Sequence, residues 1–219
     1  MLVTGHTGFK GSWLALWLHA LGAEVHGFAS NPPTTPSLFA LTSLDEVVSS
    51  ISGDVRDLAA VEAAVAESRP EVVFHLAAQA LVNGSLAAPV GKYWTNVLGK
   101  VHVLEALRGA SHDVRAVVCV TSDKCYVNRD WEWGYRESDE LGGLDPYSSS
   151  KACQELVAAS YRDSLTGDDL AIATARAGNM IGGGAGRSTA SSSMSCRPAW
   201  RAGPSLCATQ AACAHGNTC

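Results

Sequence analysis

The sequence predicts an α/β domain with a doubly wound parallel sheet over residues 1–184, and two observations lead to this fold class. Short β-branched runs alternate with longer segments whose apolar residues recur at helical spacing. A glycine-rich turn follows the first of these runs. Strand, helix and strand in repetition is typical of a parallel sheet covered on both faces, and such sheets bind ligands at the carboxyl ends of their strands.

The expected elements alternate along this part of the chain. Strands are expected at residues 1–5, 25–28, 47–48, 72–76, 117–120 and 170–173, the first of them short. Helices are expected at residues 13–21, 58–67, 95–107 and 148–161. Polar residues that directly follow a strand should therefore lie at the edge of the sheet where ligands bind.

Composition and charge exclude several classes of protein. The chain has 219 residues, of which 47% are hydrophobic, and its net charge is -5. That charge argues against a nucleic acid or an anionic membrane surface as the main partner, because both favour excess lysine and arginine. No apolar stretch reaches membrane-spanning length, and the first residues lack the basic region of a signal peptide, so a cytoplasmic protein is expected.

Seven cysteines are present, but their spacing predicts neither a disulfide framework nor a metal site. Cys119, Cys125 and Cys153 lie in the body of the chain, the other four lie after residue 195, and no C-x-x-C pair occurs. Residues 185–219 contain three arginines but no Lys, Asp, Glu, Val or Ile. This segment has little apolar area to offset chain entropy, so it is expected to be a disordered tail.

The glycine-rich turn, Gly5-His6-Thr7-Gly8-Phe9-Lys10-Gly11, opens a helix near Ser12. Glycines at such a turn let the backbone approach a pyrophosphate, whose charge is met by the helix N-terminus. The alternative is a plain turn, but the position after a strand favours a cofactor site. The predicted cofactor contacts in the turn are Gly5, Thr7, Gly8, Phe9 and Gly11.

Two further residues are candidates for the adenosine end of a dinucleotide. An acidic residue usually holds the ribose hydroxyl after the second strand, but this chain has Asn31 there. Asn31 can hydrogen-bond a hydroxyl without repelling a 2'-phosphate as a carboxylate would, so NAD is preferred over NADP only moderately. Asp54 is expected near the adenine amino group, and the alternative is a turn or helix cap ahead of Leu58.

The segment Tyr147-Ser148-Ser149-Ser150-Lys151 places a phenol and an amine one helical turn apart on one face. The Lys151 ammonium is expected to lower the pKa of the Tyr147 phenol and to reach a bound ribose. A phenolate prepared in this way can take a proton from a sugar hydroxyl as its hydride leaves. The alternative is a tyrosine and a lysine on a solvated face.

Thr121-Ser122-Asp123-Lys124 ends the strand expected at residues 117–120, at the ligand-binding edge of the sheet. The segment offers a hydrogen-bond donor, an acid and a base in succession, and a polar turn is the alternative. The order of glycine loop, strand-end serine and Tyr-x-x-x-Lys pair favours the catalytic interpretation.

These residues resemble the extended short-chain dehydrogenase/reductases, and within them the CDP-glucose 4,6-dehydratases. The resemblance rests on VTGHTGFKGSWL from Val3, HLAAQ from His75, TSDKCY from Thr121, WGYRESDELGGLDPYSSSK from Trp133 and ARAGNMIGGG from Ala175. It covers most of residues 1–184. It implies a Rossmann-like fold that binds NAD, a nucleotide-sugar substrate and a homodimer, for which helices 97–107 and 152–161 are candidates; packing on the chain's own sheet is the alternative for both.

The resemblance also implies a reaction and roles for the site residues. Tyr147 takes the C4 hydroxyl proton of CDP-glucose while hydride passes to NAD, and Ser122 donates a hydrogen bond to the C4 oxygen. Lys124 is the base near C5, and Asp123 is the acid that expels the C6 hydroxyl as water. Hydride then returns to C6, which gives CDP-4-dehydro-6-deoxyglucose. Further residues implied are Ala77, Asn96 and Lys151 at the cofactor and Gln79 and Asn179 at the substrate.

The chain departs from the family at three places, and the first is Asn31, which stands where the family usually has the ribose-binding acid. The segment after Gln79 reads Leu81-Val82-Asn83-Gly84-Ser85-Leu86, where the family usually has Leu-Val-Arg-Arg-Ser-Tyr. The family also continues past Gly184 into a substrate-binding lobe. Reading the codons of residues 206–218 one base out permits VRHPGSVRPWQHV, part of which resembles a family segment. We therefore expect residues 185–219 to be a non-native, frameshifted tail and this form to show little or no turnover.

Two other functions are compatible with part of the motif set. A sugar-nucleotide 4-epimerase or reductase of the same superfamily keeps Tyr147 and Lys151 but has no use for Asp123 and Lys124. A non-catalytic dinucleotide-binding sensor needs none of these four side chains.

Overall fold

The computed structural model of the protein describes residues 1–80, 88–111, 114–166 and 170–184. Within these ranges the six strands form one sheet, in the order β3-β2-β1-β4-β5-β6, and every pair is parallel. The strands are β1 Leu2–Thr4, β2 His26–Ala29, β3 Ser49–Ser52, β4 Val72–His75, β5 Ala116–Val120 and β6 Ala171–Ala175.

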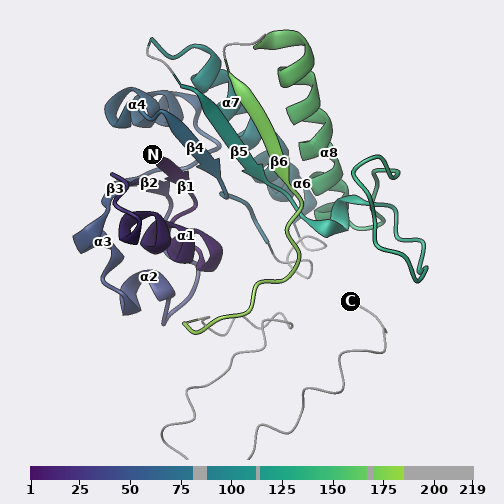
Figure 1. Cartoon of the computed structure of the whole chain (residues 1–219), viewed down its shortest axis with the longest axis horizontal. Coiled ribbons are helices and arrows are strands. Elements are labelled where there is room, and N and C mark those ends of the chain that lie inside the picture. The colour runs from purple at the N-terminus through teal and green to yellow at the C-terminus, as the bar shows by residue number, and fades with distance from the viewer. Residues whose placement is uncertain (81–87, 112–113, 167–169, 185–219) are drawn as a thin grey trace, which may run out of the picture.

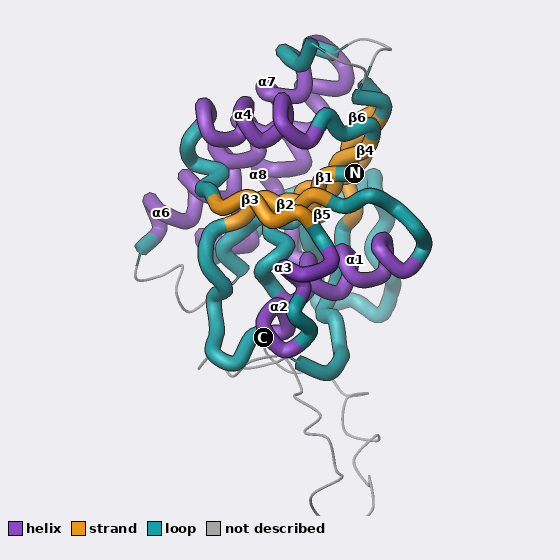
Figure 2. The backbone as a smooth tube through the Cα atoms, turned by 90° about the vertical axis from the view of Figure 1, so that its left-hand side faces the viewer, coloured by secondary structure: helices purple, strands orange, loops and turns teal. Residues whose placement is uncertain are grey.

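The helical segments lie between these strands. The α-helices are α1 Phe9–Ala20, α2 Leu38–Leu41, α3 Leu44–Val47, α4 Leu58–Ser68, α6 Pro89–Tyr93, α7 Gly99–Arg108 and α8 Pro146–Ser160. The described residues also contain two π-helical segments, η1 Trp94–Leu98 and η3 Tyr161–Leu165, and one 3-10 turn, η2 Asp123–Cys125. Figures 1 and 2 show α1, α2 and α3 on one face of the sheet and α4, α7 and α8 on the other.

This arrangement confirms the predicted doubly wound parallel sheet, and most expected elements lie where the sequence placed them. The strand expected at residues 47–48 is wrong, because Leu44–Val47 is a helical turn and the strand is Ser49–Ser52. β3 pairs only with β2 and lies at the edge of the sheet, so its polar side chains are tolerated there. The first helix begins at Phe9, earlier than the apolar pattern indicated.

The apolar core lies in two clusters, one on each face of the sheet. The larger cluster joins the sheet to α4, α7 and α8 and includes Val65, Val73, Leu104, Val117 and Ala158. The smaller cluster joins the sheet to α1 and α3 and includes Val3, Ala15, Leu18, Leu44 and Val48. Both faces of the central strands are therefore buried, as a parallel sheet requires.

The topology also fixes where a ligand can bind. β1 and β4 are neighbours, but the chain after β1 enters α1 on one face, whereas the chain after β4 leads towards α7 on the other. The two connections diverge at the carboxyl ends of the strands, and α/β sheets bind ligands in the crevice that forms at such a point. Every site residue predicted from the sequence follows the carboxyl end of a strand or lies on the helices beside it.

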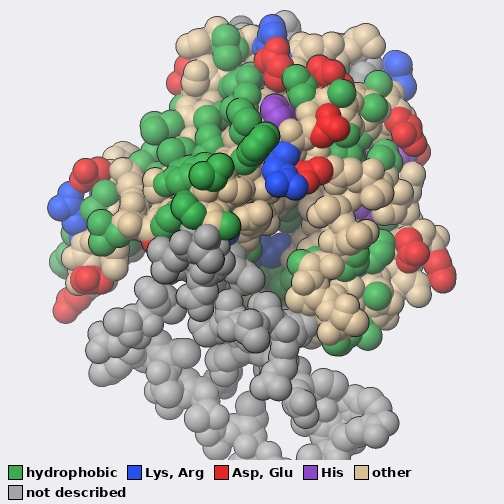
Figure 3. Space-filling model, turned by 180° about the vertical axis from the view of Figure 1, so that it is seen from behind, with side chains coloured by type: hydrophobic (Ala, Val, Ile, Leu, Met, Phe, Trp, Pro, Cys, Tyr) green, Lys and Arg blue, Asp and Glu red, His purple; other side chains and the backbone are tan. Residues whose placement is uncertain are grey.

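Several large apolar side chains lie on the surface. Figure 3, which shows the molecule from behind, has hydrophobic side chains gathered in one broad area. Exposed apolar residues occur on α6, η1 and α8, where Val90 is 74%, Trp94 50%, Leu98 42% and Leu156 60% exposed. By contrast, Val103, Leu104 and Leu107 of α7 pack against the sheet.

The packing of α7 on the sheet is testable. Leu104→Ala removes a side chain that is 0% exposed, and we expect a loss of about 2–5 kcal/mol in the free energy of unfolding because a cavity is left in the larger cluster. Urea unfolding followed by circular dichroism measures this loss. Leu21→Ala, at a side chain that is 71% exposed, should cost less than about 0.5 kcal/mol. Equal losses in the two variants would contradict the core assignment.

Candidate active site

The glycine loop after β1 brings three backbone segments closer together than a side chain would allow. Gly5 has φ of 78°, and the Gly8 N–H donates to the Gly5 carbonyl at 3.0 Å. A Cβ atom at Gly11 would lie 2.1 Å from the Gly5 oxygen, and one at Gly5 would lie 2.7 Å from the Ala77 nitrogen. Glycine is therefore required at both positions, and the loop after β4 lies directly against the loop after β1.

The N-terminus of α1 faces this crevice without a side-chain cap. Gly8 is the N-cap residue, and no side chain accepts from the first backbone N–H groups of α1, which begins at Phe9. Such an end carries partial positive charge and N–H donors suited to a phosphate. Thr7 donates from its hydroxyl to the Ser30 carbonyl at 2.9 Å, which ties the loop to the end of β2. The predicted loop residues therefore lie together around one uncapped helix end.

The two candidates for the adenosine end lie beyond β2 and β3. Asn31 is exposed directly after β2, next to the segment that Thr7 holds. Asp54 follows β3 and accepts hydrogen bonds from its neighbour Arg56, at 2.9 Å from the backbone N–H and 2.6 Å from the guanidinium. Asp57, not Asp54, caps α4, and Asp54 lies in a local turn with Arg56. The adenine contact of Asp54 stays a prediction.

The segment after β4 is held by α6 and η1. The Asn96 side chain is fully buried; its oxygen accepts from the Gln79 N–H at 2.8 Å and its nitrogen donates to the Ser150 hydroxyl at 2.9 Å. The Lys92 ammonium donates to the Gln79 carbonyl at 2.7 Å. The Asn96 side chain therefore fixes the loop that carries Ala77 and Gln79 to helix α8. The divergent segment at residues 81–86 lies outside the described residues.

The Ser-Asp-Lys segment forms a tight turn at the carboxyl end of β5. The Ser122 hydroxyl accepts from the Lys124 N–H at 3.2 Å and donates to the Asp123 carboxylate at 2.9 Å. Ser122 is buried, Asp123 is exposed, and Lys124 is half-buried. The three side chains therefore offer a donor, an acid and an amine within one turn of chain, as predicted.

Helix α8 presents Tyr147 and Lys151 beside this turn. The Asp145 carboxylate caps the helix by accepting from the Tyr147 and Ser148 N–H groups at 2.9 and 3.1 Å, which fixes Tyr147 in the first turn. The Lys151 ammonium is buried, donates to the Val120 carbonyl at 3.4 Å and lies 5.9 Å from the centre of the Tyr147 ring. The phenol and the amine therefore both lie at the end of β5, where the Ser122 turn begins.

The electrostatics of this pair differ from the expectation. The pKa of Tyr147 is raised, not lowered, because burial disfavours the phenolate and the charges of Asp123 and Asp145 add to it; only a hydrogen bond with Ser122 opposes the rise. The pKa of Lys151 is lowered to about 7, first by burial and then by the positive charge of Lys100 and other lysines. In the ligand-free chain, Lys151 therefore carries only part of a charge at neutral pH.

The segment after β6 closes the crevice from the other side. The Lys10 ammonium of α1 donates to the Gly178 carbonyl at 2.9 Å. A Cβ atom at Gly178 would lie 3.5 Å from the Asp123 carboxylate. Asn179, the predicted substrate contact, is exposed in this same segment. The structure thus brings the glycine loop, the Ser122 turn and the segment of Asn179 around one crevice.

One buried ion pair at the site was not singled out from the sequence. The Arg176 guanidinium, at the end of β6, donates to the Glu155 carboxylate of α8 at 3.0 Å and to the Tyr126 hydroxyl at 2.8 Å. Glu155 also accepts from the hydroxyls of Thr121 and Thr174. The sequence spacing could have indicated Glu155, because it lies four residues after Lys151 and therefore on the same helix face.

Burial pushes the pKa of Glu155 upward, but the hydrogen bonds from Thr121, Arg176 and Thr174 outweigh it and leave the pKa below its ordinary value. Glu155 is therefore a carboxylate at neutral pH. It holds the carboxyl ends of β5 and β6 together directly below the Ser122 turn.

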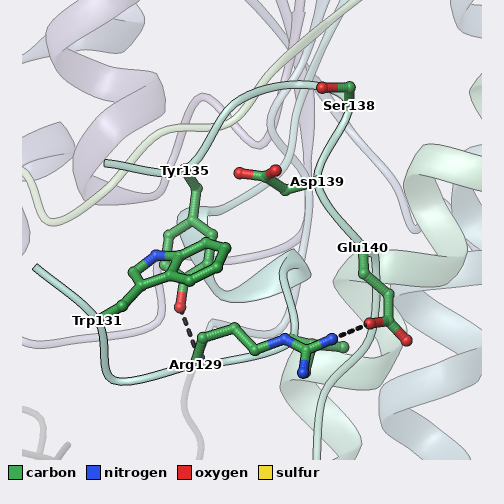
Figure 4. Close-up of a pocket in the computed structure, with 7 residues that line it drawn as sticks. Arg129, Trp131, Tyr135, Ser138, Asp139 and Glu140 are labelled. Atoms are coloured by element: carbon green, nitrogen blue, oxygen red, sulfur yellow. Dashed lines mark hydrogen bonds and ion pairs between the residues drawn. The ribbon is translucent and has the colours of Figure 1, made fainter. Parts of the chain in front are cut away.

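The loop between β5 and α8 forms a pocket of about 470 Å³ next to the crevice. Figure 4 shows the Tyr135 and Trp131 rings beside the Arg129 side chain, which bonds to Glu140. The Tyr135 ring also stacks on Tyr126, with the ring centres 4.9 Å apart. Arg176 donates to the Tyr126 hydroxyl. The pocket is therefore linked to the Arg176–Glu155 ion pair through Tyr126 and Tyr135.

The part of the chain that the structure describes shows no group of three or more His, Cys, Asp or Glu residues arranged to hold a metal ion. In the same ranges, no helix combines the length and the apolar character needed to cross a membrane.

Comparison with known proteins agrees with this geometry. The family model described as GDP-mannose 4,6 dehydratase matches residues 2–189. The chain belongs to this family. It is 50% identical over 190 residues to the CDP-glucose 4,6-dehydratase of Salmonella typhimurium, covering 84% of this chain and 53% of that protein. This similarity confirms the resemblance found in the sequence motifs.

Two further relatives are less similar to the chain. The dTDP-glucose 4,6-dehydratase of Streptomyces antibioticus is 32% identical, over 74% of this chain and 48% of that protein. The crystal structure of the Thermus thermophilus UDP-glucose 4-epimerase in complex with NAD superposes with a TM-score of 0.66 at 30% identity. It is matched over 80% of this chain and 53% of that chain. The chain spans about half the length of the curated relatives it matches.

The buried ion pair gives a prediction with a defined pH dependence. Because the pKa of Glu155 is lowered in the folded chain, its contribution to stability is present above the ordinary pKa and is lost as the pH falls through the folded value. Arg176→Met leaves a buried carboxylate without its cation, so we expect a loss of about 3–5 kcal/mol at pH 7 and a smaller loss near pH 4.

Urea unfolding at the two pH values measures the effect. The control is Arg108→Met, which breaks an ion pair with Glu105 whose side chains are 46% and 35% exposed, and it should cost about 0–1 kcal/mol. A loss for Arg176→Met that is the same at both pH values would contradict the role assigned to Glu155.

Proposed function

We propose that the chain is the NAD-binding half of a CDP-glucose 4,6-dehydratase. The observation that carries the proposal is the turn of Ser122, Asp123 and Lys124 at the end of β5, beside Tyr147 and Lys151 of α8. The 50% identity to the Salmonella typhimurium enzyme supports the choice of substrate, CDP-glucose. The product is CDP-4-dehydro-6-deoxyglucose.

The residues around the crevice fit a dinucleotide. Gly5 and Gly11 leave the space that a Cβ would fill, and the uncapped N-terminus of α1 offers N–H donors to a diphosphate. Thr7, Gly8 and Phe9 line the same turn, Ala77 lies against it in the loop after β4, and the buried Asn96 holds that loop. Asn31 and Asp54 are the candidates for the adenosine end. NAD bound there would supply the hydride acceptor for C4 of the sugar and the hydride donor for C6.

Tyr147 is the group that takes the C4 hydroxyl proton. Its raised pKa means that it is a neutral phenol in the ligand-free chain, so a positive charge is needed nearby when it acts as a base. Two ammonium groups can provide this charge: Lys92 of α6 and Lys151 of α8 lie 5.5 and 5.9 Å from the centre of the Tyr147 ring. A hydrogen bond with Ser122 also opposes the rise. Lys151 would also hold the ribose of the cofactor.

Asp123 and Lys124 perform the dehydration. A ketone at C4 acidifies the C5 hydrogen, so elimination becomes feasible only after oxidation. Lys124 then removes the C5 proton, and Asp123 gives a proton to the C6 hydroxyl, which leaves as water. Gln79 and Asn179 contact the substrate at the two sides of the crevice.

A second candidate is a sugar-nucleotide 4-epimerase, because a UDP-glucose 4-epimerase superposes with a TM-score of 0.66. Such an enzyme transfers hydride at C4 but does not remove water, so it leaves Asp123 and Lys124 without a role. Their position beside Tyr147 favours the dehydratase.

Assembly, location and domain division complete the proposal. A homodimer is expected, and the exposed Leu98 and Leu156 near the candidate helices are available for it, whereas most apolar residues of α7 pack on the sheet. A cytoplasmic location also stays a prediction. Residues 1–184 are proposed as the NAD-binding domain; the predicted disordered, frameshifted tail at 185–219 lies outside the described residues.

The cofactor site is testable with the chain as it is. We expect the 219-residue chain to bind NAD in calorimetric titration, and Gly11→Ala to weaken binding at least about tenfold, because its Cβ displaces the Gly5 carbonyl. The control is Gly91→Ala, where an added Cβ meets no atom within 4 Å, and its affinity should equal that of the parent chain. Equal affinities in all three proteins would contradict the glycine-loop site.

The division of roles is testable in a fusion of residues 1–184 with the remaining C-terminal part of the Salmonella typhimurium relative. Asp123→Asn and Lys124→Met should lower product formation about 10²–10⁴-fold while NADH still accumulates, because only elimination is blocked. Tyr147→Phe should prevent NADH formation itself. NADH absorbance and mass spectrometry of the sugar nucleotide measure the two steps.

Asp163→Asn, at an exposed residue of η3, serves as the control and should leave both steps unchanged. An epimerised sugar of unchanged mass would favour the second candidate. Loss of NADH formation in the Asp123 and Lys124 variants would contradict the separation of the two steps.

A further inference from the structure

The chain has five lysines, and all of them lie around the carboxyl end of the sheet: Lys10, Lys92, Lys100, Lys124 and Lys151. Three of these, Lys92, Lys100 and Lys151, are 1%, 0% and 4% exposed. Lysine is almost never buried to this extent, because removing an ammonium from water is costly. Lys151 has the role proposed above, whereas Lys100 has no role in the mechanism.

Lys100 lies in the first turns of α7, on the side that packs against the sheet. Its ammonium donates to the Gln154 carbonyl of α8 at 2.8 Å and lies close enough to the Cys119 thiol of β5 for each group to shift the pKa of the other. The Lys151 ammonium donates to the carbonyl of the next residue, Val120, at 3.4 Å. Two buried ammonium groups from two helices therefore meet the last two residues of β5.

The groups around the two ammonium ions provide little negative charge. The titratable groups that face them are Lys10 of α1, His75 of β4, Lys92 of α6, Cys119 of β5 and Tyr147 and Glu155 of α8. Burial lowers the pKa of His75 to about 3 and raises the pKa of Cys119, so both are neutral near pH 7. The Glu155 carboxylate is already paired with Arg176.

We propose that Lys100 is a positioning residue for Lys151: its buried positive charge controls the charge on Lys151 and thereby makes dinucleotide binding depend on pH near neutrality. The part that concerns the dinucleotide rests on the proposed function. The part that concerns the two lysines rests on their burial and on their contacts with neighbouring residues at the end of β5.

The physical argument concerns like charges in a medium of low polarity. Two ammonium ions repel each other more strongly in the protein interior than in water, so the proton on Lys151 is released at a lower pH while Lys100 is charged. The pKa of Lys151 is lowered to about 7, and after burial the charge of Lys100 is the largest contribution to that shift. The pKa of Lys100 is itself lowered by burial, so its own titration has to be measured alongside.

The first experiment measures the two lysines directly. The 219-residue chain is labelled with ¹³C at the lysine Cε, and the five signals are followed by NMR as the pH is raised. Lys100→Met removes the charge and the hydrogen bond to Gln154, whereas Lys100→Gln removes only the charge. We expect the midpoint of Lys151 to move up by at least about one pH unit in both variants.

Two results would overturn the proposal. A midpoint of Lys151 that stays within about 0.3 pH units in both variants would show that Lys100 does not act on it. Titration of Lys100 well below Lys151 would show that Lys100 is neutral when Lys151 titrates. Lys100→Gln keeps a donor for the Gln154 carbonyl, so it tests the proposal even if Lys100→Met fails to fold.

The second experiment measures NAD affinity between pH 6 and pH 9. In the parent chain the affinity should fall as the pH rises through about 7, because Lys151 loses the charge that favours a diphosphate. In Lys100→Gln this fall should occur at higher pH, so the variant should bind NAD several-fold more tightly than the parent at pH 8 and equally at pH 6. A purely structural role would weaken binding at both pH values and overturn the proposal.

The control for the loss of one positive charge is Arg115→Met. Its side chain is 76% exposed and lies at the amino end of β5, away from the crevice. We expect both the Lys151 midpoint and the pH dependence of NAD affinity to match those of the parent chain. If no protein binds NAD at any pH, the proposed function fails, whereas the NMR titration still decides the action of Lys100 on Lys151.

Discussion

The close approach of three backbone segments at the switch between β1 and β4 is the constraint on which the site depends. Gly5 and Gly11 permit this approach, because a Cβ at either position would overlap backbone atoms of the neighbouring segment. The contact places the loop after β4 against the loop after β1, and Asn96 then joins it to α8 through Ser150. The position of α8, and therefore of Tyr147, is in this way coupled to the glycine loop.

Helix α8 distributes the chemistry of the site along one face. Tyr147, Lys151 and Glu155 are spaced by four residues and all turn towards the carboxyl ends of β5 and β6. The first residue faces the crevice, the second contacts the last carbonyl of β5, and the third binds Arg176 and two threonines. One helix thus carries both a reacting group and a residue of the ion pair that fixes β5 and β6. The Asp145 cap fixes where this helix begins, and therefore where both groups lie.

The sequence predicted the central strands and the long helices because their apolar periodicity is strong, but it misplaced β3, an edge strand whose side chains are mostly polar. The proximity of Tyr147 and Lys151 was predicted because one motif contains both residues. A contact was missed where it depends on strand order, as between Arg176 and Glu155, which meet only because β6 lies beside β5. The pKa direction of Tyr147 was wrong because burial, which decides it, is a property of the folded chain.

Buried lysines link ligand binding to folding. In the unfolded chain these ammonium groups are hydrated, whereas folding gathers them at one edge of the sheet. Burial there lowers the pKa of Lys92 to about 8, and burial together with repulsion from the other lysines lowers that of Lys151 to about 7. A diphosphate held at the N-terminus of α1 brings negative charge to this edge and offsets that repulsion. Because such a ligand binds only the folded chain, its binding free energy adds to the stability of the fold. The repulsion between buried lysines lowers the stability of the ligand-free domain, and the same lysines favour the binding of an anionic cofactor.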